Sequence, residues 1–325
     1  MTADTRTPVA ADGDVTVRRH GIVPPKQVLR FLRALPGLPG LRRLGPWLYL
    51  APLLLFIGVF KVWPLIWGVY LSFFHVRPYL GDEYVGTDNY HKLFSDPDLR
   101  SAVVHTLLDA LLAVSGSILV GFGLALLLQG PARHVRILRT AVFLPTVIAM
   151  VAAAELWTTL LYPSRYGAVN SMLGHAGIGP ESFFSSPHSS LASVIAMQVW
   201  KHAPYDMVIF VAGLASVDRE MYEACEIDGA SRWQRLRYVT LPTLRPITTI
   251  VLVLGVIRGL RVFTDIWVAT NGGPAGSSES VVTYLYRQFS QNNDTGYAAA
   301  IGTSLLAVTV VLTCLMLVWR RRREI

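Results

Sequence analysis

The sequence has little charge and almost no cysteine. Asp, Glu, Lys and Arg make up only 15% of its 325 residues, compared with about 25% in a typical soluble domain. Hydrophobic residues make up 52%, and the mean hydropathy is +0.44. This balance argues against a soluble protein and indicates a membrane protein. The two cysteines, Cys225 and Cys314, are too few for a disulfide framework and show no metal-binding spacing, so we interpret both as buried or structural thiols.

Motifs for catalysis and for nucleotide binding are also missing. The chain has no H-E-x-x-H zinc motif and no G-x-S-x-G nucleophile motif, and its eight histidines show no metal-ligand spacing. It also has no G-x-x-x-x-G-K-[ST] phosphate loop. We therefore expect no catalytic residue, no metal and no cofactor on this chain, and we do not expect an enzyme.

Long apolar runs dominate what is present. A transmembrane helix needs about 20 mostly apolar residues. Six runs are long enough, at 48–74, 103–128, 137–161, 191–214, 246–269 and 297–319. Gly, Pro, Asn and Ser punctuate the segments between them. The predicted fold class is an all-α integral membrane protein with six transmembrane helices.

These runs divide the chain into three parts. Residues 1–46 are predicted to form a partly disordered cytosolic tail, residues 47–320 a six-helix transmembrane domain, and residues 321–325 a basic cytosolic C-terminus. We expect no cleaved signal peptide, because no short apolar core with a small-residue cleavage site follows the first charges. Residues 27–44 alternate basic and apolar side chains. They are either a surface-bound amphipathic segment or a plain leader.

The distribution of Lys and Arg predicts the orientation in the membrane. With the N-terminus in the cytosol, 20 of the 29 Lys and Arg residues fall in cytosolic segments and 5 in outside loops. The other four, Lys61, Lys201, Arg258 and Arg261, fall within spans. Because positive charge marks the cytosolic side, both termini are expected there. The net charge of +8 therefore needs no nucleic-acid partner.

Three outside loops, at 75–102, 162–190 and 270–296, are long for simple connections. Aromatic residues are frequent at their edges. Two interpretations stay open for these residues, an interfacial belt or a docking surface for an extracytoplasmic partner.

The predicted cytosolic segment 215–245 carries the signals of two short helices. Asp218 can cap a helix over 219–227, and Gly229 suits the left-handed residue that ends it. Ser231 followed by Gln234 reads as a capping box that starts a second helix. Pro242 is expected to end that helix, because proline disfavours the helical conformation in the residue before it.

The same segment resembles the EAA loop of the membrane-spanning subunits of ATP-binding-cassette (ABC) importers. The matching positions are Glu223, Ala224, Asp228, Gly229, Ala230, Leu241 and Pro242. Cys225 stands where a second alanine is common in that family, and Leu236 where phenylalanine is common. Both are small apolar changes, and the spacing of the loop is intact.

Motifs outside the loop extend this resemblance to about residues 47–320. The segments 85–94, 144–145, 166–170, 270–274, 284–286 and 296–300 are similar to the larger permease of carbohydrate and glycerol-phosphate importers. The resemblance implies the type I ABC importer permease fold and uptake of a sugar or sugar-like solute by alternating access in a bacterial plasma membrane. Its implied partners are a second homologous permease, two ATPase subunits that bind ATP and Mg, an extracytoplasmic solute-binding protein and membrane lipid. The seven matching loop positions would contact the ATPase.

Polar and aromatic residues inside the spans are candidates for the substrate path, because ionisable groups in a membrane mark functional sites by default. The candidates are Trp157, Gln198, Trp200, Lys201, Arg258, Arg261, Asp265 and Asn271. Two structural alternatives stay open. Arg261 and Asp265 are at i, i+4 and can pair, and Asp206 can neutralise Lys201 or His202. Gly255 and Gly259 form a small-xxx-small pattern that permits close helix approach.

Rival functions have weaker support. A secondary transporter would use intramembrane acids such as Asp109 and Glu155, but it would leave segment 215–245 unexplained. A permease for amino acids is disfavoured by the sugar-type outer motifs. The sequence does not name the substrate, nor does it say which of the two permeases would bind it.

Overall fold

A computed structural model describes residues 41–77 and 81–324. Most of the predicted tail and the last residue lie outside the described residues. The chain forms two units, Met1–Val62 and Trp63–Ile325. In the first unit, helix α2 (Leu41–Ile57) runs into the π-helical turn η1 (Gly58–Val62).

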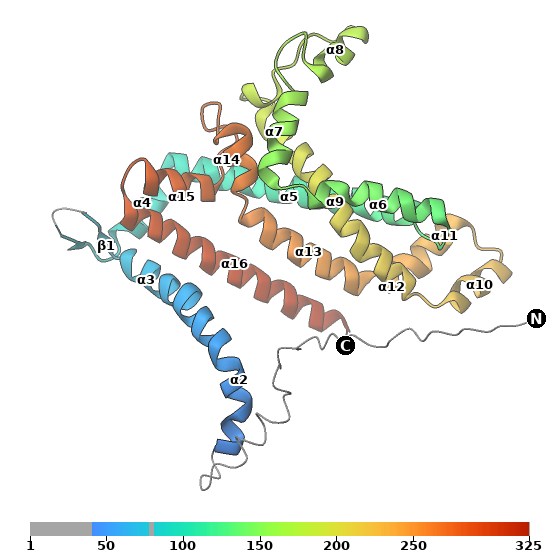
Figure 1. Cartoon of the computed structure of the whole chain (residues 1–325), viewed down its shortest axis with the longest axis horizontal. Coiled ribbons are helices and arrows are strands. Elements are labelled where there is room, and N and C mark those ends of the chain that lie inside the picture. The colour runs from blue at the N-terminus through green and yellow to red at the C-terminus, as the bar shows by residue number, and fades with distance from the viewer. Residues whose placement is uncertain (1–40, 78–80, 325) are drawn as a thin grey trace, which may run out of the picture. The chain divides into compact units, whose positions relative to one another are not determined.

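The described part of the second unit is almost entirely helical and carries a small hairpin (Figure 1). The hairpin pairs β1 (Phe74–His75) with β2 (Glu83–Tyr84), and Phe74 lies opposite Tyr84. The α-helices are α3 (Trp63–Leu71), α4 (Asp88–Ser95), α5 (Pro97–Leu127), α6 (Arg133–Val147), α7 (Met150–Leu160), α8 (Ala168–His175), α9 (Ser190–Ala215), α10 (Arg219–Ile227), α11 (Arg232–Arg235), α12 (Leu241–Thr243), α13 (Arg245–Leu260), α14 (Thr264–Thr270), α15 (Val281–Ser290) and α16 (Thr295–Glu324). Two irregular turns complete them, the 3-10 helix η2 (Phe183–Ser185) and the π-helix η3 (Leu236–Thr240).

Helix α5 lies along both α9 and α13 at the centre of this unit. Gly255 and Gly259 of α13 make the second contact possible. A Cβ at Gly255 would lie 2.6 Å from a Val114 methyl, and one at Gly259 would lie 2.8 Å from the Cβ of Ala110. The predicted close approach at these glycines is confirmed, and small residues at a helix crossing are typical of membrane proteins.

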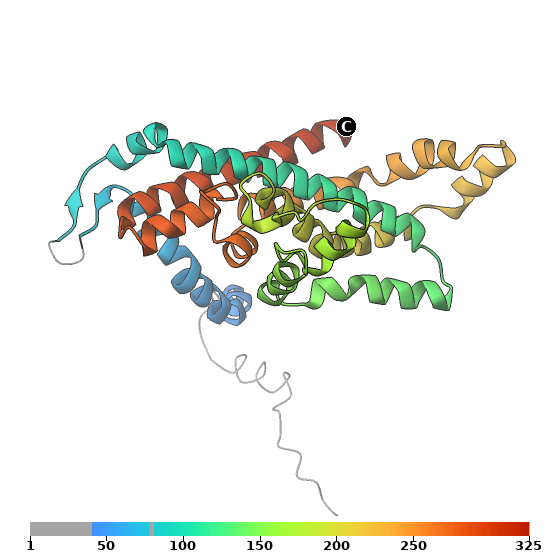
Figure 2. The ribbon, with the colours of Figure 1, turned by 90° about the horizontal axis from the view of Figure 1, so that it is seen from above.

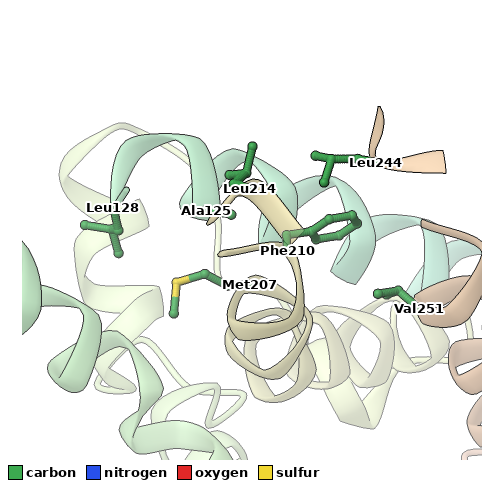
Figure 3. Close-up of a cluster of buried hydrophobic side chains, with 7 residues drawn as sticks. All are labelled: Ala125, Leu128, Met207, Phe210, Leu214, Leu244 and Val251. Atoms are coloured by element: carbon green, nitrogen blue, oxygen red, sulfur yellow. The ribbon is translucent and has the colours of Figure 1, made fainter. Parts of the chain in front are cut away.

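A buried apolar cluster joins these helices near the end that carries α10–α12. Seven side chains form it: Ala125, Leu128, Met207, Phe210, Leu214, Leu244 and Val251 (Figure 3). Phe210 also packs edge-on against Phe122 at 5.3 Å. In Figures 1 and 2 the α10–α12 segment lies at the opposite end of this unit from α4 and α15.

Within residues 41–77 and 81–324, three helical segments are long and apolar enough to cross a membrane: Tyr49–Leu71, Pro97–Leu127 and Thr295–Val318. The number rises to five if each of two bent helix pairs forms one span. The most apolar windows of the first and third segments are 0% and 6% buried within the chain, which suits surfaces that face lipid or another membrane subunit. Cys225 and Cys314 are free thiols, and Cys314 is exposed on the last of these helices.

The predicted span 137–161 is not one straight helix. Helices α6 and α7 meet at 98°. Pro145 lies in the last turn of α6, and Ile148 and Ala149 are extended, with ψ values of 134° and 141°. Proline removes a backbone donor and its ring crowds the preceding turn, so a break near this position has a local cause.

The predicted single span 246–269 is also wrong as one helix, because α13 ends at Leu260 and α14 begins at Thr264. The carbonyl of Val262 at this break is buried and accepts a hydrogen bond from Ser280 Oγ at 2.9 Å. Such a partner is what lets irregular backbone persist in a membrane protein. The possible i, i+4 pair between Arg261 and Asp265 is absent from the described ion pairs, because the two residues lie on either side of the break.

A network around Asp96 fastens α5 to α15 and α16. The Asp96 carboxylate caps α5, accepting from the backbone N–H groups of Asp98 at 3.0 Å and Leu99 at 3.3 Å. It also accepts from the hydroxyls of Tyr284 at 2.6 Å and Tyr297 at 2.5 Å. Partial burial raises the pKa of Asp96, but these four hydrogen bonds outweigh it and hold the pKa below its usual 3.8.

The lowered pKa of Asp96 makes the stability of the folded protein depend on pH. The stability that Asp96 contributes is present above its unfolded pKa near 3.8 and is lost as the pH falls through the lower folded value. We therefore expect the melting temperature of wild type to fall more steeply below about pH 4 than that of Asp96→Asn, which keeps the cap but not the charge. Asp96→Ala should lose about 1 kcal/mol of stability at pH 7. If the melting temperatures of wild type and Asp96→Asn changed with pH in the same way, this prediction would be contradicted.

Candidate functional site

Segment 215–245 folds as two short helices joined at a glycine. Helix α10 begins after Asp218, whose side chain accepts from the N–H of Glu220 at 3.1 Å. Gly229 follows α10 with φ +72°, in the left-handed region, which glycine enters without a steric cost. Ser231 and Gln234 form the predicted capping box at the start of α11. The sequence-based predictions for these elements are confirmed.

The expected helix end at Pro242 is wrong. Helix α11 continues through the π-helix η3 into α12, and the chain turns only at Leu244. In the π-helical turn, the N–H of Leu241 bonds to the carbonyl of Leu236, five residues back. Pro242 occupies the first turn of α12, where its missing N–H costs little.

Both ends of this segment are fixed in the apolar cluster of Figure 3. Leu214 precedes α10 and is 9% exposed, and Leu244 follows α12 and is 1% exposed. Inside the segment, the Tyr222 hydroxyl lies 2.9 Å from Thr240 Oγ1, and Arg235 pairs with Glu226. The segment is therefore braced as one piece and attached to α9 and α13 at its two ends.

The seven predicted ATPase-contact positions lie along this braced segment. Glu223, Ala224, Asp228, Gly229 and Leu241 are exposed, and Ala230 and Pro242 are partly exposed. Glu223 makes an i, i+4 ion pair with Arg219 at 2.9 Å, and both side chains are largely exposed. Such a pair is weak in water, so Glu223 can exchange it for another partner at little cost.

Sequence reasoning missed the exposed apolar residues of the same segment. Met221 is 45% exposed, Ile227 88%, Trp233 65% and Tyr238 69%. Large apolar side chains exposed on a charged surface indicate an interaction site. The sequence feature that could have identified them is their position in an otherwise polar stretch between two apolar runs.

A second constellation of polar residues lies between α5, α9 and α13. Asp206 is 2% exposed. Its Oδ2 accepts from Ser117 Oγ at 2.7 Å and lies 3.5 Å from Arg258 Nη2. The expected alternative in which Asp206 neutralises Lys201 or His202 does not hold, since its ion-pair partner is Arg258. Ser117 was missed, because a lone serine in an apolar helix gives no signal.

Asp109 of α5 is a further buried acid and is fully inaccessible. Its Oδ1 accepts from Gln198 Nε2 at 3.1 Å, while its Oδ2 has no hydrogen-bond partner among the described residues. A buried polar atom left without a partner is costly. Asp109 therefore lies beside the substrate-path candidate Gln198 with one carboxylate oxygen unpartnered among the described residues.

A small cavity of about 10 Å³ lies against these groups. Its lining contains three of the predicted substrate-path residues, Gln198, Arg258 and Asp265. His202 and Val262 line it as well. A volume of this size holds about one water molecule, so a sugar does not fit in this conformation.

The remaining predicted path residues do not line this cavity. Trp157 packs edge-on against Trp200, with ring centroids 5.8 Å apart. Arg261 is exposed, and Asn271 is exposed with a left-handed backbone after α14. The ammonium of Lys201 binds backbone carbonyls between α6 and α7.

A second, open hollow of about 500 Å³ lies in the segment between α7 and α9. Its lining includes Arg165, Asn170 and His175. The Asn170 side chain bonds to both backbone groups of Glu181 and to the Tyr162 carbonyl, which holds the walls of the hollow together. No group of three or more His, Cys, Asp or Glu side chains in residues 41–77 and 81–324 is arranged to hold a metal ion.

Comparisons with known proteins agree with one another. The model of the family of binding-protein-dependent transport system inner membrane components matches residues 99–325. The chain is 33% identical over 280 residues to a probable ABC transporter permease protein of Pyrococcus horikoshii, covering 85% of this chain and 96% of that protein. It is 30% identical over 268 residues to the trehalose/maltose transport system permease of Thermococcus litoralis, covering 82% and 90%.

The fold is also shared with a solved transporter. The chain superposes with a TM-score of 0.76 and 27% identity on a chain of the bacterial alginate ABC transporter, solved in complex with an alginate pentasaccharide-bound periplasmic protein. The match covers 86% of this chain and 95% of that chain.

Proposed function

Because the chain belongs to the family of binding-protein-dependent transport system inner membrane components, we propose that it is the permease subunit of an ATP-driven importer of sugars. The observation that carries this proposal is the braced segment 215–245, with left-handed Gly229 between two helices and its ends fixed in the core. A secondary transporter or a channel gives no reason for such an element.

The proposed topology has six spans with both termini in the cytosol. The Lys and Arg distribution supports this orientation, and α9 supplies a span whose polar residues are buried against α5. The membrane is the plasma membrane of a bacterium. Segment 215–245 then faces the cytosol, while α4, α8 and α15 face outside.

The braced segment couples the chain to an ATPase on a separate subunit that binds ATP and Mg. The exposed side chains of Ile227 and Trp233 supply the apolar anchors that dominate binding energy at interfaces, and Glu223 supplies an available charge. Because Leu214 and Leu244 fix both ends of the segment, a push on α10 and α11 moves α9 and α13 together. Such rigid-body motion is how packed helices switch between two arrangements.

The substrate path runs along α9 and α13, past Gln198, Arg258 and Asp265. The other predicted path residues, Trp157, Trp200, Lys201, Arg261 and Asn271, lie around it. The small cavity is the closed form of this path, and a second permease completes its other wall. Joint motion of α9 and α13 relative to the second permease widens this path to admit solute, which a binding protein delivers from outside.

The substrate class is carbohydrate. A trehalose/maltose permease and an alginate transporter are both similar to this chain, and Gln198, Arg258 and Asp265 offer the donors and acceptors that hydroxyl groups need. A glycerol-phosphate compound is a second candidate, because Arg258 could bind an anion.

The test is ATP hydrolysis by the assembled complex. The chain is purified with the second permease and the ATPase encoded beside it, and the binding protein is added with trehalose, maltose, an alginate oligosaccharide or glycerol phosphate. One loaded solute is expected to stimulate hydrolysis by about fivefold or more. Failure of any ATPase to copurify, or hydrolysis indifferent to every loaded solute, would contradict the proposal.

A further inference from the structure

Lys201 is a buried ammonium in a membrane-spanning helix. It is 7% exposed, whereas Lys61 and Lys92 are exposed. Its neighbours on α9, Gln198 and His202, line the cavity, whereas the Lys201 ammonium bonds to a backbone carbonyl at the end of α6. A buried cation needs partners that offset its lost hydration.

The partners of Lys201 are two backbone carbonyls. Its Nζ donates to the carbonyl of Pro145 at 2.8 Å and to the carbonyl of Ile148. Both belong to the break between α6 and α7, where the last carbonyls of α6 lack N–H partners within the helix. The C-terminal end of a helix also carries partial negative charge, which favours a cation.

The break depends on these bonds for an electrostatic reason. Ile148 and Ala149 are extended, so the carbonyls around them leave the helical pattern. Inside a membrane no water can take the place of the missing donors, and each unsatisfied group costs several kcal/mol. Without the ammonium, a straighter helix that restores backbone hydrogen bonds becomes the better arrangement for residues 145–149.

The break also sets one wall of the cavity. Helix α7 begins directly after it and carries Trp157, which packs against Trp200 of α9. Trp157 also packs against the buried cluster that contains Val262 and Ile266. Val262 lines the cavity. A change in the direction of α7 is therefore transmitted to the cavity wall through Trp157.

We propose that Lys201 is a positioning residue of the substrate path, whose ammonium, supplied by α9, holds the α6–α7 break and thereby places Trp157 against the cavity wall. The inference rests on the proposed function in treating the cavity as part of the path. The break itself can be measured whether or not transport is observed.

The experiment measures the bend between α6 and α7 in the assembled complex in lipid nanodiscs. Double electron–electron resonance gives the distance between two nitroxide labels, one on each helix. Cys225 and Cys314 are replaced by serine, and nitroxides are attached at Ile137→Cys in α6 and Leu160→Cys in α7. These side chains are 62% and 39% exposed. With a rise of 1.5 Å per residue, the labelled backbones are about 22 Å apart across a 98° bend and about 35 Å apart along a straight helix.

The variants separate charge and hydrogen bonding from bulk. Wild type is expected to give one narrow distribution near the shorter distance. Lys201→Met keeps the length of the side chain but has no donor, and its distribution should move toward the longer distance. Lys201→Arg keeps charged donors and should restore the wild-type distribution. The matched control, Lys61→Met, removes an exposed lysine from another apolar helix and should change nothing.

A wild-type distribution in Lys201→Met would overturn the proposal, because side-chain bulk alone would then hold the break. So would a shift in Lys201→Arg as large as that in Lys201→Met. If Lys201→Met does not assemble, Lys201→Gln, which has N–H donors but no charge, replaces it. A longer distance in Lys201→Gln than in Lys201→Arg supports the proposal, and equal distributions overturn it.

Discussion

Replacing Gly229 with valine is expected to uncouple ATP hydrolysis from the loaded binding protein while the complex stays assembled. Gly229 has φ +72°, and a Cβ built there would meet nothing within 4 Å. The cost therefore comes from the backbone and not from a clash. A non-glycine residue in the left-handed region costs about 1–2 kcal/mol, and a β-branched residue is especially unfavourable there. The chain can relieve this strain only by changing the angle between α10 and α11.

In the proposed coupling role, that angle sets whether Ile227 and Trp233 can reach one partner surface together. A loss of 1–2 kcal/mol corresponds to a decrease of roughly 5- to 30-fold in stimulated hydrolysis. The matched control is Gly130→Val in the loop between α5 and α6, where φ is +114° and a Cβ also has open space. It introduces similar strain in another loop and should leave stimulation unchanged. Equal loss in both variants would show a general folding defect and contradict the specific role of Gly229.

The local structure of segment 215–245 was predictable because its signals are short-range. A capping aspartate, a glycine at a helix end and a capping box each act within four residues, and Asp218, Gly229 and Ser231 adopt the predicted roles. The helix end at Pro242 was not predictable in the same way. The π-helical turn before it contains Val239 and Thr240, which are buried, and burial against other parts of the chain is a tertiary feature that no short-range signal reports.

The polar centre of the bundle shows the limit of sequence reasoning more clearly. The apolar runs of the sequence predicted that Gln198, Arg258 and Asp265 would lie within membrane spans. In the structure these three residues line one cavity. The ion pair between Asp206 and Arg258 could not be predicted from the sequence, because these two residues are on different helices and Ser117 is on a third. At the helix breaks at 148–149 and 261–263, backbone carbonyls accept hydrogen bonds from Lys201 and Ser280, which come from distant parts of the chain.

Arg258→Met is expected to destabilise the protein strongly, because it removes the cationic partner of a buried carboxylate. Asp206 is 2% exposed, and Arg258 Nη2 lies 3.5 Å from its Oδ2. Removing one partner of a buried pair typically costs about 3–5 kcal/mol, whereas replacing both partners with apolar residues is often neutral. The single variants Arg258→Met and Asp206→Leu should therefore each melt at a lower temperature than wild type in purified complex. The double variant should recover most of the loss.

The double variant also decides between two roles for Arg258, a structural partner of Asp206 and a residue of the substrate path. Ser117 keeps a partner in it, because its hydroxyl also lies 3.2 Å from the Val114 carbonyl. If Arg258 is a structural partner of Asp206, the double variant will lose much less stability than the two single variants lose together, which is the non-additivity expected of residues in contact. If Arg258 serves only the substrate, Arg258→Met will melt like wild type and lose solute uptake alone. In a third outcome, the melting temperatures follow the pattern of a structural pair while the stable double variant loses solute uptake. That combination of results would show that Arg258 serves both roles.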